Sequence, residues 1–460
     1  MIFPKKLWTV LFFFLFISFI VQADESPLPP DTPAIEVVTV ERAVELAMQN
    51  NIQLASTAID VRMKKRARDY AWNVFVPSVQ ATGTLARSNN VSNPYEDLIR
   101  MLNPMYQSPE TTESDHWNAI AGLNISLNLN LALVEGFRAT RQNYEAGVLT
   151  YEQARQETEI NVRKAFYGLL LQEGSLAVAR DKLATSEERL EQTRINYQNG
   201  LVPELSYLQM QLAVETQKPA IMETVLQLDQ NKNLFGFLIG LPPGSEIVLE
   251  GSINPETQSF DADELVEQYL GNRFDLALLE QNRLMLETSL RATQIQRFTP
   301  SIALSQTYSP RLSSIEDSWT DTGNWTDSSG AFSVTVLFNI MEMFPFSSSG
   351  VKAADTRDQI EKLDLAFNQL ADNAEIEVRD LVKKLDKSRA AITAMELNVS
   401  MAEKAFTLTE QAYRAGIKEY LDLKDAENML VEARVGVLLE KFNYLSALLD
   451  LEKALNITLQ

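Results

Sequence analysis

The sequence contains no cysteine and only one histidine, His116. Without cysteine there are no disulfide bonds and no lipid-anchored thiol, and zinc sites built from histidine and cysteine are excluded. A serine–histidine catalytic pair would have to use His116, and although the residue counts do not exclude carboxylate chemistry, no motif indicates it. We therefore expect no catalytic residue, no metal and no cofactor, and a protein that is not an enzyme.

Proline is absent between Pro109 and Pro203, and again after Pro345. A proline inside a helix costs about 3 kcal/mol, so its absence permits very long helices. The same stretches are rich in Ala, Leu, Glu, Gln, Lys and Arg, which favour helix.

Long apolar runs are confined to the N-terminus. Lys5 and Lys6 precede an apolar run from Leu7 to Val21, and Ala23 completes a signal-peptidase site. A transmembrane anchor is the alternative, but the run is short for a span of ~20 residues, and an acidic, proline-rich stretch follows. We expect a signal peptide at 1–23 and an N-terminal periplasmic segment at 24–40. No later run resembles a membrane helix, so further membrane insertion would require a strand barrel.

Positive charge is scarce, with 41 Lys and Arg against 62 Asp and Glu and a net charge of −21. Such acidity argues against nucleic acid as a partner, because phosphates would be repelled. Two interpretations remain open: simple solubility, and a negative lumen or mouth.

Apolar residues recur every seven positions in two series: Val162, Leu169, Leu176, Leu183, Leu190 and Tyr197, then Val378, Leu385, Ile392, Val399, Phe406 and Tyr413. A sustained seven-residue spacing indicates coiled-coil packing. We predict long helices at 136–197 and 351–413, the first about 90 Å long at ~1.5 Å per residue.

The two series belong to a tandem duplication. Tyr197-Gln-Asn-Gly200 matches Tyr413-Arg-Ala-Gly416, and Phe75-Val-Pro77-Ser78-Val79 matches Phe298-Thr-Pro300-Ser301-Ile302. We place the first repeat at 41–242, a linker at 243–260 and the second repeat at 261–460. A single helix is expected at about 41–75, before the first strand pair. Each long helix is followed by a turn and a further helix, at 203–240 and 419–458. Pro203 suits a first helical turn, whereas Pro219 predicts a kink or break.

Each repeat also contains a pair of strands, predicted at 79–87 with 117–133 and at 302–308 with 330–340. Apolar and polar residues alternate there, which is typical of a strand with one oily and one wet face. A half-buried sheet of a soluble protein would alternate in the same way. The signal, the strand length and the coiled-coil helices favour a membrane barrel, with the polar loops 88–115 and 309–329 on its outer side. Four strands cannot close a barrel, because small bacterial barrels have at least eight, so several chains must combine.

The order of these features resembles the TolC-like outer-membrane efflux family over essentially the whole chain after the signal. The duplicated Phe-x-Pro-Ser motif, the duplicated Tyr-x-x-Gly turn and Leu238-Ile-Gly-Leu-Pro-Pro-Gly244 carry the resemblance. It implies an α+β membrane protein that forms a homotrimer, with a 12-strand barrel in the outer-membrane lipid and a periplasmic α-helical coiled-coil tunnel. It further implies a passive, gated exit duct for efflux or type I secretion. Its partners would be a periplasmic adaptor (membrane fusion) protein and an inner-membrane RND, ABC or MFS transporter.

The resemblance also implies a periplasmic gate at the helix-hairpin turns Gly200 and Gly416. Tyr413 precedes the second turn, Lys418 stands where the family has an arginine, and Asp422 and Asp425 match two inward aspartates. Six carboxylates from three chains would favour cations. The sequence departs from the family at Ser206, where an acidic partner is expected, so the clamp around Lys418 would be weaker or rebuilt. Alternatively, the aspartates are ordinary solvated helix charges and the glycines simple helix caps.

Two other functions compete with the duct. A periplasmic coiled-coil adaptor would normally have one helical hairpin, whereas this chain has two hairpins and two strand pairs. A free-standing diffusion porin would lack long tunnel helices.

Overall fold

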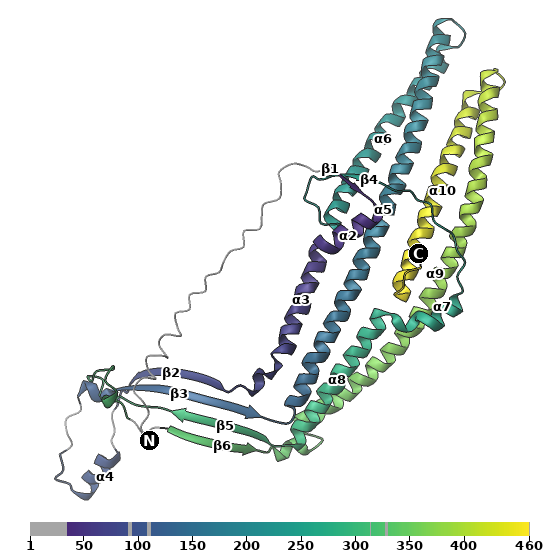
Figure 1. Cartoon of the computed structure of the whole chain (residues 1–460). Helices are drawn as coiled ribbons and strands as arrows, with labels where there is room; N and C mark the ends of the chain where they lie inside the picture. The colour runs from purple at the N-terminus through teal and green to yellow at the C-terminus, as the bar shows by residue number, and fades with distance from the viewer. Residues whose placement is uncertain (1–34, 91–93, 108–111, 313, 327–329, 460) are drawn as a thin grey trace.

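The computed structural model describes residues 35–90, 94–107, 112–312, 314–326 and 330–459. The chain is elongated, with four strands side by side at one end and two helix hairpins at the other (Figure 1). The expected signal peptide and the start of the expected N-terminal segment lie outside the described residues. Within the described ranges, no helix combines the length and apolarity needed to cross a membrane.

Two long helices run the length of the molecule. They are α5 (Leu133–Gln198) and α9 (Ser348–Arg414), and each is followed by a turn and a shorter helix, α6 (Glu204–Leu238) or α10 (Tyr420–Leu455). Ser347 caps α9, because its side chain accepts a hydrogen bond from the Gly350 amide. These long helices follow from the stretches without proline.

The shorter helices differ from the predictions in two respects. Of the kink or break predicted at Pro219, the break is absent, because helix α6 continues through this residue. The hydrogen bond lost at proline is local, and α6 is held against α5 there by buried Val214 and by Gln217, whose Nε2 donates to Ser186 Oγ at 3.2 Å. The single helix expected at about 41–75 is instead α2 (Val40–Asn50), α3 (Ile52–Asp69) and the 3-10 turn η2 (Ala71–Phe75).

The break between α2 and α3 has a specific cause. Asn51 has extended backbone angles, and its side chain accepts a hydrogen bond from the Leu54 amide, capping α3. The same side chain donates to the Leu238 carbonyl at 2.9 Å. Asn51 thereby ties the entrance of α3 to the end of α6.

The four strands form one antiparallel sheet in the order β2 (Ser78–Arg87), β3 (Trp117–Leu129), β5 (Ser301–Tyr308) and β6 (Gly330–Leu337). The loops between paired strands contain α4 (Pro94–Leu102), η3 (Glu113–His116) and η5 (Thr322–Asn324).

Two strands end earlier than predicted. The strand expected to reach residue 133 ends at Leu129, and α5 already begins at Leu133. The strand expected to reach residue 340 ends at Leu337, and Ile340 begins the 3-10 turn η6 (Ile340–Met343). Two or three apolar residues at alternate positions fit the first turn of a helix as well as a strand, so periodicity alone does not place the boundary.

The remaining elements lie around the middle of the long helices, except for the last helix among them, which runs from there to β5 (Figure 1). Strands β1 (Ile35–Val38) and β4 (Glu246–Leu249) pair in parallel, and α7 (Ala262–Tyr269), η4 (Leu270–Asn272) and α8 (Phe274–Phe298) begin the second half of the chain. The helices contact one another in a series. Helices α3 and α6 contact α5, α5 also contacts α8 and α10, and both of these contact α9.

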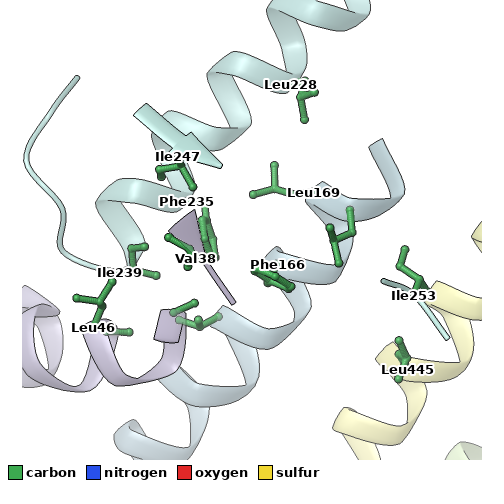
Figure 2. Close-up of a cluster of buried hydrophobic side chains, with 14 of the residues drawn as sticks. Val38, Leu46, Phe166, Leu169, Leu228, Phe235, Ile239, Ile247, Ile253 and Leu445 are labelled. Atoms are coloured by element: carbon green, nitrogen blue, oxygen red, sulfur yellow. The ribbon is translucent and has the colours of Figure 1, made fainter. Parts of the chain in front are cut away.

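The main apolar core lies where β1 and β4 meet α5 and α6. Phe166, Phe235, Ile239 and Ile247 pack together there with Val38 (Figure 2). Burying each large apolar side chain contributes about 1.5–3 kcal/mol. A second core joins α9 and α10 and includes Val378, Leu385, Tyr444 and Leu451.

Candidate functional site

The strand register sorts apolar and polar side chains onto opposite faces of the sheet. On one face Val79 lies opposite Ile125, and Leu127, Leu304 and Val334 form a row across three strands. On the other face a row of four serines crosses all four strands, at Ser78, Ser126, Ser305 and Ser333. A sheet with one oily and one hydroxyl-bearing face suits a boundary between lipid and water.

Both outer strands of this sheet lack a partner on one side within the described chain. The sheet ends at β2 on one side and at β6 on the other. An unpaired strand edge exposes backbone N–H and C=O groups, which cannot remain unsatisfied in a bilayer.

The helices present a matching pair of apolar faces that no described segment of the chain covers. Leu205, Leu208 and Leu212 on α6 are each at least 50% exposed, as are Leu397, Met401 and Leu408 on α9. Helix α6 packs on α5, and α9 packs on α8 and α10. The two exposed stripes therefore belong to helices at the two ends of this series of contacts. Apolar stripes at coiled-coil spacing normally bury themselves against another helix.

The two helix hairpins end in turns of the same construction. Gly200 and Gly416 both have left-handed backbone angles, with φ of 72° and 70°. In the first hairpin the rings of Tyr197 and Tyr207 stack across the turn at 5.6 Å between centroids. The glycines therefore serve as helix caps, an observation compatible with both interpretations of the turns.

The structure brings two of the expected gate residues together. Lys418 Nζ lies 3.3 Å from Asp422 Oδ2, so the lysine pairs within its own hairpin. The Asp422 carboxylate also accepts from the Glu419 amide at 3.4 Å, as part of a capping box at the start of α10. Asp425 is exposed, one turn further along the helix, and Tyr413 is half-buried.

Sequence reasoning missed the ion pairs that join the two hairpins above these turns. Arg189 on α5 places Nη1 2.8 Å from Glu427 Oε1 on α10, and its Nη2 lies 3.6 Å from Glu410 Oε1 on α9. The guanidinium also lies over the Phe406 ring, 5.3 Å from its centroid. Arg189 Nη2 is buried and makes no hydrogen bond with any residue that the structure describes. One arginine thus contacts both helices of the second hairpin.

This region is partly shielded from water. The Arg189 side chain is 13% exposed and that of Glu427 is 11% exposed. Burial raises the pKa of the neighbouring Tyr420 phenol, and the Glu427 carboxylate adds to the rise. Two opposite charges with little exposure to solvent attract each other more strongly than a pair on the surface, because water screens them less. A signal was present in the sequence, because Arg189 and Glu427 each lie eleven residues from the turn glycine of their hairpin.

Comparison with known proteins places this geometry in a family. Residues 43–240 and 265–456 match the family model for outer membrane efflux proteins. The chain is 22% identical over 435 residues to the probable efflux pump outer membrane protein TtgC of Pseudomonas putida, covering 90% of this chain and 82% of that protein. It is 25% identical over 339 residues to the alkaline protease secretion protein AprF of Pseudomonas aeruginosa, covering 70% and 67%.

A solved structure has the same fold. The crystal structure of the outer membrane protein VceC from Vibrio cholerae superposes with a TM-score of 0.68 at 18% identity, over 92% of this chain and 97% of that one. Together with the match of the family model to both halves of the sequence, this shows that the chain belongs to the outer membrane efflux protein family.

Proposed function

We propose that three copies of this chain form a passive, gated exit duct through the outer membrane, serving an efflux pump or a type I secretion system. Family membership supports the location and the transport role. Relatives named for an efflux pump and for protease secretion support the two kinds of machine.

The observation that carries the proposal is the open sheet. Edges β2 and β6 need partners, and β6 of one copy is available to β2 of the next. Three copies would contribute twelve strands, above the minimum of eight for a closed bacterial barrel. The same rotation would bring the exposed stripe of α9 beside the exposed stripe of α6, so that sheet and helices close together.

A passive duct needs partners that supply the energy for transport. The chain would draw no energy itself, and an inner-membrane RND, ABC or MFS transporter would supply it through a periplasmic adaptor. We propose no catalytic role. The adaptor function is disfavoured, because this chain has two hairpins and a four-stranded amphipathic sheet.

The gate would lie at the hairpin turns. Asp422 and Asp425 from three copies would surround a narrow opening and attract cations. Since Lys418 pairs with Asp422 inside one hairpin, we assign the link between hairpins to Arg189 and its two glutamates. Opening would then require the second hairpin to part from α5.

The proposal is tested on the mature protein extracted from outer membranes. We expect a detergent-resistant trimer that becomes monomeric on heating and forms channels in planar bilayers. A protein released from membranes by salt alone, monomeric and unable to conduct, would support the adaptor alternative instead.

A further inference from the structure

The polar face of the four-stranded sheet carries no charged side chain. Its residues are Ser78, Gln80, Thr82, Thr84 and Ala86 on β2; Asn118, Ile120, Gly122, Asn124, Ser126 and Asn128 on β3; Ser301, Ala303, Ser305 and Thr307 on β5; and Ala331, Ser333, Thr335 and Leu337 on β6. Hydroxyl and amide groups thus make up the polar part of this face.

The hydroxyls on this face are paired across the strands. Ser78 Oγ and Ser126 Oγ lie 2.7 Å apart, and Ser305 Oγ and Ser333 Oγ also lie 2.7 Å apart. Ser126 and Ser305 are opposite each other in the register, so one row joins both strand pairs. These groups both donate and accept hydrogen bonds, and they present no net charge to a passing solute.

The charges in this half of the molecule lie beyond the strands. The strands' one arginine, Arg87, ends β2 on the opposite face, where its Nε donates to Glu113 Oε1 at 2.7 Å. Residues 88–116 contain five acidic residues and one arginine, and residues 309–329 contain four acidic residues and one arginine. The acidity of the chain is therefore placed at the loops and in the helices.

We propose, on the basis of the duct function above, that this polar face is the inner wall of the barrel and that it passes anionic and cationic polar solutes alike. A lining of hydroxyl and amide dipoles can solvate either sign of charge, whereas rings of charged side chains select one. Charge selection then belongs to the carboxylates beyond the ends of the strands, among them Asp422 and Asp425.

The absence of cysteine makes a direct test possible, because any introduced thiol is unique. Ser126→Cys places a thiol in the serine row, and Leu127→Cys places its matched control one residue along the same strand, on the opposite face. Single channels in 0.1 M KCl, where the Debye length is ~10 Å, are treated with a cationic and then, separately, an anionic methanethiosulfonate reagent. Reversal potentials are then measured across a KCl gradient, because symmetric KCl gives zero for any selectivity. The rate at which each reagent modifies the channel is divided by the rate at which the same reagent modifies a small thiol in solution.

We expect both reagents to modify Ser126→Cys at normalised rates within about threefold of each other, less than the tenfold that 1.4 kcal/mol of charge preference produces. The cationic adduct should shift the reversal potential towards anions and the anionic adduct towards cations, while Leu127→Cys stays unmodified. Rates that differ tenfold or more, or a conducting Ser126→Cys channel that neither reagent modifies, would overturn the inference alone. Failure of the unsubstituted chain to form channels would overturn the proposed function as well.

Discussion

Arg189 and Glu427 join the two halves of the duplicated chain, with 2.8 Å between Nη1 and Oε1 and little exposure of either side chain. The pair connects α5 to α10 eleven residues from each turn, and Glu410 adds a weaker contact from α9. A charge-assisted hydrogen bond at such a site contributes about 1.5–3 kcal/mol. This is enough to bias a hairpin between two positions.

Replacing Arg189 should therefore favour the open channel. We expect Arg189→Ala to raise the open probability in planar bilayers by about tenfold, the ratio that 1.4 kcal/mol gives, and Arg189→Lys to have a smaller effect. The matched control is Arg138→Ala, which removes an arginine of the same helix far from the turns. A double-mutant cycle with Glu427→Gln measures the coupling between the two residues. Strictly additive effects would show that the pair does not hold the hairpins.

Replacing Asp422 and replacing Asp425, the two aspartates near the second turn, should have different effects. Asp425→Ala should raise conductance and weaken block by divalent cations, because the proposed trimer would lose a ring of three carboxylates. Asp422→Ala should do the same and also lower thermal stability by about 0.5–2 kcal/mol, because Asp422 takes part in the capping box of α10. Bilayer recording and thermal unfolding report the two effects. Unchanged conductance and block in the double variant would remove both residues from the gate.

The turn glycine should not tolerate a side chain. Gly416→Ala is expected to cost about 1–2 kcal/mol, because φ is 70°, although no atom in the described part of the chain lies within 4 Å of the added Cβ. The matched control is Gly136→Ala, which also has open space but lies in helix α5 at ordinary φ; it should gain up to about 1 kcal/mol. Thermal unfolding of the two variants compares them. Equal effects would mean that conformation at the turn is not the cause.

Glu342 should give the junction between sheet and helices a pH dependence. Hydrogen bonds from the Ser349 hydroxyl and amide lower the pKa of its carboxyl. The contribution to stability is therefore complete above the ordinary glutamate pKa of about 4.3 and is lost as pH falls through the lower folded-state pKa. The difference in melting temperature between the unsubstituted chain and Glu342→Gln should shrink from pH 6 to pH 3. A difference that grows towards low pH would contradict the sign of the shift.

The periodic features of the sequence were enough to predict the architecture. Seven-residue spacing with proline absent predicted α5 and α9 to within a few residues, since a continuous seam leaves few other structures available. Alternation predicted the four strands but extended two of them too far. Leu131 and Leu133 continue the alternate pattern although the chain has already turned into α5.

Features that depend on contacts between distant segments were not predictable in the same way. The hydrogen bond from Asn51 to the Leu238 carbonyl joins residues 187 apart in sequence. The Arg189–Glu427 pair requires the rotation of each helix about its axis, which charge spacing alone does not supply. Likewise, Lys418 was interpreted through family resemblance, whereas its carboxylate partner lies four residues further along the chain.

The most direct test of the closed trimer is a disulfide between β2 and β6. Within one chain these strands are separated by β3 and β5, so they lie about 14 Å apart at ~4.8 Å per strand, beyond the ~7 Å Cα separation that a disulfide tolerates. One cysteine is fixed at Val334 and the other is placed in turn at Val79, Ala81, Gly83 and Leu85, all on the same face. The account predicts that at least one of these double variants forms a covalent trimer on oxidation in outer membranes. If every double variant runs as a monomer on denaturing gels, both with and without reducing agent, the barrel is not closed by β2 and β6 of neighbouring copies.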